Sequence, residues 1–155
     1  VGKEKCDPYA LAFAEDTEVI IEPFINGREF SCGVFKTEAE TIVFPATEIV
    51  SKNEFFDVEA KYTPGKSEEI TPARLSESEM KECQELTSKI YDLLGCSGVV
   101  RIDYLQKDGQ FYFMEINTVP GMSRESIIPK QTVAYGLPVK ELYKKQIADA
   151  LSRKR

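Results

Sequence analysis

Two neighbouring segments, Val99-Val-Arg-Ile-Asp-Tyr-Leu105 and Phe111-Tyr-Phe-Met-Glu-Ile-Asn117, decide the fold of this chain. Both are rich in the β-branched and aromatic residues that favour strands. Lys107-Asp108-Gly109 lies between them and is typical of a hairpin turn. The two segments therefore predict an antiparallel hairpin in a sheet that packs one face against another layer.

Four polar side chains lie on this hairpin. Residues two apart on a strand point to one face, so Arg101 and Asp103 project together, as do Glu115 and Asn117. A three-residue loop with its glycine in the left-handed conformation places both pairs on one face, whereas a two-residue loop at Asp108-Gly109 separates them. On one face, three oxygen ligands beside a guanidinium suit Mg²⁺ that bridges phosphate oxygens. A solvated sheet face with an Asp–Arg pair is the alternative.

Further strands and helices are predicted around the hairpin, and the strands indicate an antiparallel sheet. An apolar run predicts a strand buried on both faces at Glu18–Ile25, followed by a turn at Asn26-Gly27. The remaining elements predicted before the hairpin are a short helix at Tyr9–Glu15 and strands at Glu29–Phe35, Thr41–Phe44 and Glu48–Val50.

Two longer helices are predicted from capping and periodicity. Ser76-Glu-Ser-Glu79 has the form of a capping box, and Gly95 suits the end of the helix that follows. Its inward residues are Met80, Cys83, Leu86, Ile90, Leu93 and Leu94. The last helix begins at Pro138, and its inward residues are Val139, Leu142, Tyr143, Ile147, Ala150 and Leu151.

Residues 51–72 lack the periodicity of a helix or strand and carry several lysines and acids. Loops of more than about 12–15 residues without regular structure are uncommon in compact domains and are often functional lids. We therefore expect an active-site loop here, with a plain surface loop as the alternative.

The composition excludes several function classes. The net charge of −6 disfavours a nucleic-acid partner, because a protein that binds nucleic acid needs clustered Lys and Arg. The four cysteines form no C-x-x-C pair and the chain has no histidine, which excludes the usual zinc sites and histidine-based nucleophile pairs. We expect reduced, buried cysteines in a cytoplasmic protein.

Neither end of the chain indicates a membrane or secretory segment. No apolar run approaches the roughly 18 residues that a membrane span needs, so no membrane partner is expected. The chain begins with Val1 rather than Met, which indicates a cut or processed start.

Four motifs together resemble the D-alanine–D-alanine ligase family. They occur in order through nearly the whole chain: Glu22-Pro-Phe-Ile25 with Gly27-Arg-Glu29, Phe55-Phe-Asp-Val-Glu-Ala-Lys-Tyr62, Arg101-Ile-Asp103, and Glu115-Ile-Asn-Thr-Val-Pro-Gly-Met122. The second and fourth are more specific to this family than Glu-x-Asn is to ATP-grasp enzymes in general.

The resemblance implies an ATP-grasp fold of the α+β class, with an antiparallel sheet packed against helices. Residues 1–28 then correspond to the tail of the central ATP-binding subdomain. Residues 29–155 correspond to the C-terminal domain, with residues 51–72 as its active-site loop.

The resemblance also implies roles for individual residues. The ATP-binding positions are Glu22, Pro23, Phe24, Ile25, Glu29, Phe55, Lys61 and Met114. The ligands of two Mg²⁺ or Mn²⁺ ions are Asp103, Glu115 and Asn117. The catalytic positions are Arg101, Gly121, Lys61 and Tyr62. The positions that hold the second D-alanine are Tyr62, Ser126 and Ile127.

The implied activity is the ATP-dependent joining of two D-alanines through an acyl phosphate, for peptidoglycan precursor synthesis. The whole enzyme is expected to be a cytoplasmic homodimer. The family carries its first-substrate residues and phosphate-binding lysines upstream of the matched region, so this chain is expected to be inactive alone. A further departure is Glu125, where relatives can carry His.

Three alternatives remain open. A sister enzyme could add D-lactate or D-serine, although Tyr62 and Pro120-Gly-Met122 weigh against it. The same residues weigh against another, more distant ATP-grasp carboxylate–amine ligase. From a different class, the chain could be a nucleotide-binding or interaction module.

Overall fold

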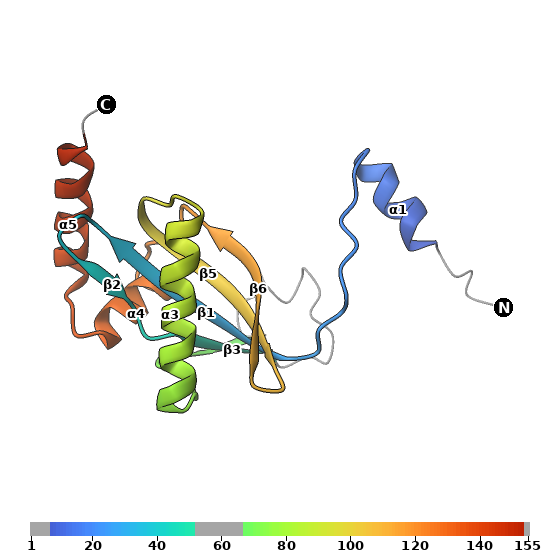
Figure 1. The fold of residues 1–155 in the computed structure, drawn as a ribbon, viewed down its shortest axis with the longest axis horizontal. Coiled ribbons are helices and arrows are strands. Elements are labelled where there is room, and N and C mark those ends of the chain that lie inside the picture. Colours follow the sequence, from blue (N-terminus) through green and yellow to red (C-terminus); the bar gives the residue numbers. More distant parts are fainter. Residues whose placement is uncertain (1–6, 52–66, 154–155) are drawn as a thin grey trace.

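The computed structural model describes residues 7–51 and 67–153 (Figure 1). Its elements are, in order, α1 (Pro8–Glu15), β1 (Arg28–Lys36), β2 (Thr41–Val43), β3 (Thr47–Ser51), β4 (Ser67–Ile70), α3 (Glu77–Leu93), β5 (Gly98–Lys107), β6 (Gln110–Asn117), α4 (Ile127–Ala134) and α5 (Val139–Ser152). No helix in these residues is both long enough and apolar enough to cross a membrane.

One antiparallel sheet organises these elements. Its strands lie in the order β4-β3-β1-β5-β6. The short strand β2 pairs with the same edge of β1 as β3 does, but farther along the strand. The central strand β1 pairs with β2 over Val34–Lys36, with β3 over Glu29–Ser31, and with β5 along its whole length. Helices pack against this sheet, so the predicted α+β class with an antiparallel sheet is confirmed.

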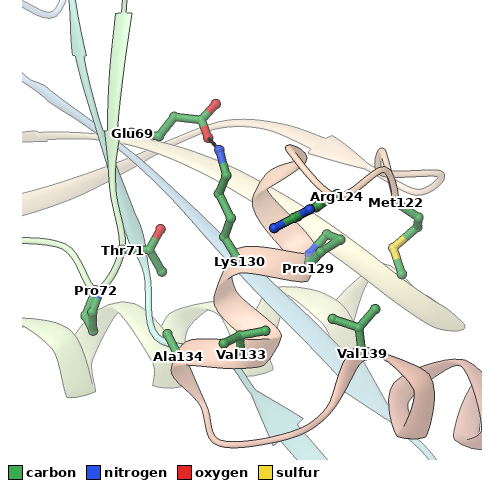
Figure 2. A pocket seen from close by; sticks show the side chains of 10 residues that line it. All are labelled: Glu69, Thr71, Pro72, Met122, Arg124, Pro129, Lys130, Val133, Ala134 and Val139. Carbon is green, nitrogen blue, oxygen red and sulfur yellow. Dashed lines mark hydrogen bonds and ion pairs between the residues drawn. The ribbon is translucent and has the colours of Figure 1, made fainter.

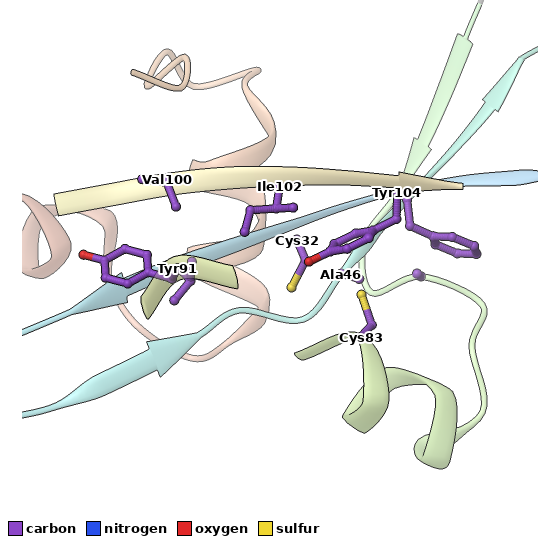
Figure 3. Packing of buried hydrophobic residues seen from close by; sticks show 10 residues of the cluster. Cys32, Ala46, Cys83, Tyr91, Val100, Ile102 and Tyr104 are labelled. Carbon is purple, nitrogen blue, oxygen red and sulfur yellow. The ribbon is translucent and has the colours of Figure 1, made fainter. Parts of the chain in front are cut away.

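The two faces of the sheet are covered differently. Ile102 and Tyr104 of β5 face α3, where they pack with Cys83 and Tyr91 (Figure 3). Val99, which points to the opposite face, packs near Ile128 of α4 and Leu142 of α5. The part of this second face that carries Arg101 and Asp103 lies beyond that cluster.

The core beneath α3 contains two cysteines as small buried residues. Cys32 and Cys83 are completely buried free thiols, and Figure 3 shows both sulfur atoms in the interior between β1 and α3. The hydrogen bond with the neighbouring Cys32 and burial raise the pKa of the Cys83 thiol, which keeps it protonated. These thiols act as core hydrophobes, as predicted.

Helix α3 begins as predicted. Ser76 caps it: its hydroxyl accepts from the Glu79 amide, and the Glu79 carboxylate accepts from the Ser76 amide, which completes the capping box. The predicted inward face is wrong near its end, because Leu93 and Leu94 are 83% and 53% exposed. The buried face instead follows i, i+4 spacing through Cys83, Thr87 and Tyr91, and the chain turns away through Gly95 in the left-handed region.

The predicted strand at Glu18–Ile25 is wrong. Helix α1 forms as expected, but the following residues have no regular structure up to the start of β1. Ile20, Ile21 and Phe24 are 87%, 72% and 89% exposed. An apolar strand buried on both faces needs neighbouring strands and a layer on each side, and no strand within the described ranges pairs with this segment. Figure 1 shows the segment extending away from the sheet.

Other differences concern the second half of the chain. The strand β4 lies inside the predicted loop at residues 51–72, and residues 52–66 of that loop lie outside the described residues. Helix α4 was not predicted. Helix α5 forms, but only Leu142 is buried, whereas Tyr143, Ile147 and Leu151 are exposed because the helix meets the sheet near its first turns.

Candidate active site

The hairpin of β5 and β6 has a shorter loop than predicted. Lys107 pairs with Gln110, so the loop contains only Asp108 and Gly109, both with positive φ (52° and 78°). This is the geometry of a type I′ turn, which Asp-Gly strongly favours. The expected three-residue loop is therefore wrong.

A β-bulge restores the arrangement that this shorter loop would otherwise destroy. Tyr104 pairs with Phe113, but the next pair joins Asp103 to Glu115, which leaves Met114 as the extra residue. Residues directly opposite in an antiparallel pair share a face, with their Cβ atoms roughly 5 Å apart. Asp103 and Glu115 therefore converge on one face.

Arg101 and Asn117 form the next such pair on the same face. Arg101 is half-buried, and its guanidinium binds Asp103 with two hydrogen bonds, from Nε to Oδ1 and from Nη2 to Oδ2, each 2.9 Å long. The Asn117 Oδ1 accepts from the Val119 amide at 3.1 Å, which begins the turn after β6. The four polar residues of the predicted site thus lie together.

The charge on Arg101 is well stabilised. Burial favours the neutral guanidine, but the hydrogen bonds and the charge of Asp103 outweigh it and raise the pKa of Arg101. The carboxylates of Glu115 and Glu69 act in the same direction. A permanently charged guanidinium therefore lies among carboxylates on this face.

Asp103 is held more firmly than the other candidate ligands. It is only 5% exposed, and the Ser31 hydroxyl of β1 donates to its Oδ1 at 2.6 Å. Among the described residues, Oδ1 thus accepts two hydrogen bonds, whereas Oδ2 accepts one, from Arg101. A carboxylate has about four acceptor positions in total, so Oδ2 keeps one for a further ligand.

These donors suit a hard cation. Magnesium prefers oxygen ligands from one or two carboxylates and keeps water or phosphate oxygens in its remaining positions. Among the residues that the structure describes, no three His, Cys, Asp or Glu side chains form a metal-binding group, so the site depends on the Asn117 amide as its third oxygen. Asp103, Glu115 and Asn117 fit such an ion by donor type.

A second group of predicted residues meets in the turn between β6 and α4. Gly121 lies against Ser126, since a Cβ on Gly121 would lie 2.8 Å from Ser126 Oγ. Ser126 occupies the N-cap position of α4, and its hydroxyl forms a 2.8 Å hydrogen bond with the Ser123 hydroxyl. Ile127 is buried at the start of the helix. The backbone of Gly121 and the Ser126 side chain could thus act on one small group.

Of the other predicted residues that the structure describes, Glu29 shares the sheet face of Asp103, whereas residues 22–25 lie before the sheet. Residues 22–25 lie in the extended segment before β1, where Ile25 alone is partly buried. Glu29 is half-buried on β1, opposite Leu105. Met114 is the bulge residue and is 45% exposed. Phe55, Lys61 and Tyr62 lie outside the described residues.

A pocket of about 860 Å³ lies between β4 and α4 (Figure 2). Its lining residues are Glu69, Thr71, Pro72, Met122, Arg124, Pro129, Lys130, Val133, Ala134 and Val139. The Lys130 ammonium reaches Glu69 across it at 3.1 Å. None of the predicted site residues lines this pocket, so the polar sheet face and the pocket are separate features.

Two residues of the site were missed in the sequence, Ser31 and Gln131. Ser31 lies two residues after Glu29 on β1, so strand alternation could have placed it on the polar face. Gln131 lies in the helix that was not predicted, and its buried side chain bonds to β1. No pattern in the sequence marks that contact.

Known proteins resemble this chain over most of its length. The family model described as "D-ala D-ala ligase C-terminus" matches residues 4–148. The D-alanine–D-alanine ligase of Bacteroides fragilis is 49% identical over 142 residues, which are 90% of this chain and 44% of that protein. This chain thus spans less than half the length of that relative.

Two solved structures are also similar. The VanG D-Ala:D-Ser ligase from Enterococcus faecalis superimposes with a TM-score of 0.78 at 39% identity, covering 90% of this chain and 40% of that one. The D-alanine–D-alanine ligase from Bacillus anthracis complexed with ATP superimposes with a TM-score of 0.66 at 32% identity, covering 83% of this chain and 41% of that one. The chain belongs to the family defined by the C-terminal part of D-alanine–D-alanine ligases.

Proposed function

We propose that this chain is the C-terminal part of an ATP- and Mg²⁺-dependent ligase that joins two D-alanines into D-alanyl-D-alanine. The observation that carries the proposal is the convergence of Asp103 and Glu115 on one sheet face beside Arg101, next to Asn117. The named relatives support the reaction. The complex of the Bacillus anthracis ligase with ATP supports ATP as the co-substrate.

The division of the chain follows the same proposal. Residues 29–155 would form the C-terminal domain, since the sheet begins with β1 at Arg28. Residues 1–28 would complete the central ATP-binding subdomain, whose other parts would cover the exposed Ile20, Ile21 and Phe24. Glu22–Ile25 would then line the adenine and Glu29 would hold the ribose.

The proposed chemistry proceeds through an acyl phosphate. The carboxylate of the first D-alanine attacks the γ-phosphorus of ATP and releases ADP. The amine of the second D-alanine then attacks the acyl carbon, the phosphate departs, and the amine loses a proton. Mg²⁺ held by Asp103, Glu115 and Asn117 would neutralise the phosphate charge.

The residues of this chain would stabilise the charge that develops in these steps. Arg101 is held by Asp103 in a fixed orientation, so its guanidinium needs little rearrangement to act on a phosphoryl or carbonyl oxygen. Gly121 lies beside Ser126, and because glycine has no Cβ, the substrate can approach the Gly121 backbone closely. Ser126 would bind the carboxylate of the second D-alanine.

The experiment that tests this function uses the longer protein that carries this chain. Glu115→Gln should lower D-alanine-dependent phosphate release by about 100-fold or more, the scale of losing one electrostatic stabiliser of a transition state. Glu38→Gln, at an exposed position between β1 and β2, is the matched control. Turnover of Glu115→Gln equal to that of the control would refute the role of the site.

A D-alanine–D-serine ligase is the second candidate, because the VanG ligase superimposes well on this chain. The two functions differ only in the second substrate. Competition between D-alanine and D-serine at equal concentrations, with product analysis by mass spectrometry, separates them. An excess of D-alanyl-D-serine would favour the second candidate.

A further inference from the structure

Strand β1 has a gap along one edge, between the segments that pair with β2 and β3. Its pairing with β3 ends at Ser31, and its pairing with β2 begins at Val34. In the gap, the carbonyl of Ser31 and the amide of Gly33 point to the same side, because residues two apart on a strand do so. Buried backbone groups of this kind require hydrogen-bond partners.

The side chain of Gln131 fills this gap. Its Nε2 donates to the Ser31 carbonyl at 2.8 Å, and its Oε1 accepts from the Gly33 amide at 3.0 Å. The second Nε2 proton goes to Thr47 Oγ1 of β3 at 3.1 Å. The amide thus takes the place of a peptide group from a neighbouring strand. Gln131 is completely buried, so these bonds face no competition from water.

The same contact leads to the candidate metal ligand. The residue whose carbonyl Gln131 holds, Ser31, donates its hydroxyl to Asp103 Oδ1 at 2.6 Å. A continuous series of hydrogen bonds therefore runs from α4 through Gln131 and Ser31 to Asp103. With Arg101 on the other side, both hydrogen-bonding positions of Oδ1 are filled.

We propose that Ser31 and Gln131 are positioning residues that orient Asp103 so that Oδ2 meets the metal. Ser31 and Arg101 together fix the plane of the carboxylate, and Gln131 fixes the backbone from which the Ser31 hydroxyl projects. This inference rests on the proposed function, since it concerns the same Mg²⁺ site. Hydrogen-bond partners that orient a metal ligand typically change metal affinity by 10–100-fold when they are removed.

The test measures Mn²⁺ binding to the longer protein that carries this chain, by the electron paramagnetic resonance signal of free Mn²⁺. Ser31→Ala should raise the dissociation constant roughly 10-fold, and Gln131→Met should raise it several-fold in the same direction. Ser31→Thr keeps the hydroxyl and should stay close to the unmodified protein.

Thr132→Val is the matched control for Gln131→Met. Thr132 is the next residue of α4, equally buried, and its hydroxyl donates to the Ile128 carbonyl of its own helix. This variant should lose some thermal stability while its Mn²⁺ affinity stays unchanged. In steady-state assays, Ser31→Ala should raise the half-saturating Mg²⁺ concentration and leave the KM for D-alanine unchanged, a division that general loosening of the fold would not produce.

The outcomes separate this inference from the proposed function. If Glu115→Gln weakens Mn²⁺ binding while Ser31→Ala and Gln131→Met, shown to be folded by circular dichroism, bind as the unmodified protein does, the positioning role is overturned. If the unmodified protein binds no Mn²⁺, or Glu115→Gln binds it equally well, the proposed metal site fails and this inference with it. If Ser31→Ala does not fold, Gln131→Met alone decides between these results.

Discussion

Asp103 and Glu115 lie directly opposite each other on β5 and β6, although the two-residue loop of their hairpin alone would place them on opposite faces of the sheet. The bulge at Met114 takes up one residue and brings Glu115 back into phase with Asp103. Bulges that re-aim a side chain occur often next to active sites. The turn and the bulge therefore act together to form the candidate metal site.

Removal of the bulge residue tests this relationship. Deleting Met114 should make the ladder regular, with Phe113 opposite Tyr104 and Glu115 still opposite Asp103, so Mn²⁺ binding should persist. Deleting Ile116 instead is the matched comparison, because it moves Asn117 opposite Ile102, onto the face beneath α3. That variant should lose Mn²⁺ affinity. If the Met114 deletion folds but binds no Mn²⁺, the bulge geometry itself is required.

The hairpin contains both features that the sequence predicts and features that it does not. The shared face of Arg101 and Asp103 follows from strand alternation alone, and it is confirmed by the register with β1. The loop length was wrong because Asp108-Gly109 was assigned to a longer turn than the two-residue type it favours. No local pattern in the sequence marks the bulge.

The wrong predictions concern elements whose burial depends on distant parts of the protein. The run at Glu18–Ile25 has the composition of a buried strand, but burial needs neighbours that no described part of this chain supplies. The inward face predicted for α5 was wrong for the same reason. Helical spacing identifies an apolar face, but it does not show how much of that face other elements cover. Capping, in contrast, is local, and the box at Ser76 was predicted correctly.

A buried carboxylate makes the stability of the chain dependent on pH. Glu48 is 3% exposed and accepts hydrogen bonds from Arg28 Nε at 3.0 Å and Arg74 Nε at 2.7 Å. Burial alone would raise the pKa of Glu48, but the two arginines outweigh it and lower that pKa below its ordinary value. A carboxyl whose folded-state pKa is lowered stabilises the fold above its unfolded pKa, about 4.3 for Glu, and this contribution is lost as the pH falls through the folded-state pKa.

Glu48→Gln should therefore lower the free energy of unfolding by about 1.5–3 kcal/mol at pH 7, the range for hydrogen bonds to charged groups. Urea unfolding at pH 7 and at about pH 3 should show the difference between the two proteins shrinking in acid. Glu38→Gln at an exposed position should change little at either pH. A Glu48→Gln difference that stays constant between the two pH values contradicts this account.

Substitutions at Gly33 and Gly121 should differ in their effect on stability. A Cβ on Gly33 would lie 2.5 Å from Ile128 Cδ1 and 2.7 Å from Gln131 Oε1, so Gly33→Ala should cost about 1–3 kcal/mol of stability by overpacking. Gly121 is exposed, and among the described residues its added Cβ would meet only the Ser126 side chain. Gly121→Ala should therefore keep the unfolding midpoint but raise the KM for the second D-alanine in the longer protein. Unchanged kinetics in Gly121→Ala would separate this turn from substrate binding.

The 155-residue chain alone is expected to form no dipeptide. Acyl transfer requires both reactants in near-attack geometry, and such positioning can supply roughly 7–11 kcal/mol of the barrier. The chain supplies Arg101, Gly121, Ser126 and the oxygen cluster around Asp103, but it spans only 44% of the Bacteroides fragilis relative. The residues that bind the first D-alanine are expected in the part of the relatives that this chain does not match.

Incubation of the purified chain with ATP, Mg²⁺ and D-alanine, followed by mass spectrometry for D-alanyl-D-alanine and an assay for phosphate, tests this expectation. The longer protein is the positive control, and its Glu115→Gln variant sets the background. Mn²⁺ binding by the chain should survive even without turnover, because Asp103, Glu115 and Asn117 all lie on one hairpin. Sustained dipeptide synthesis by the chain alone would show that these residues, with no upstream domain, can hold both substrates.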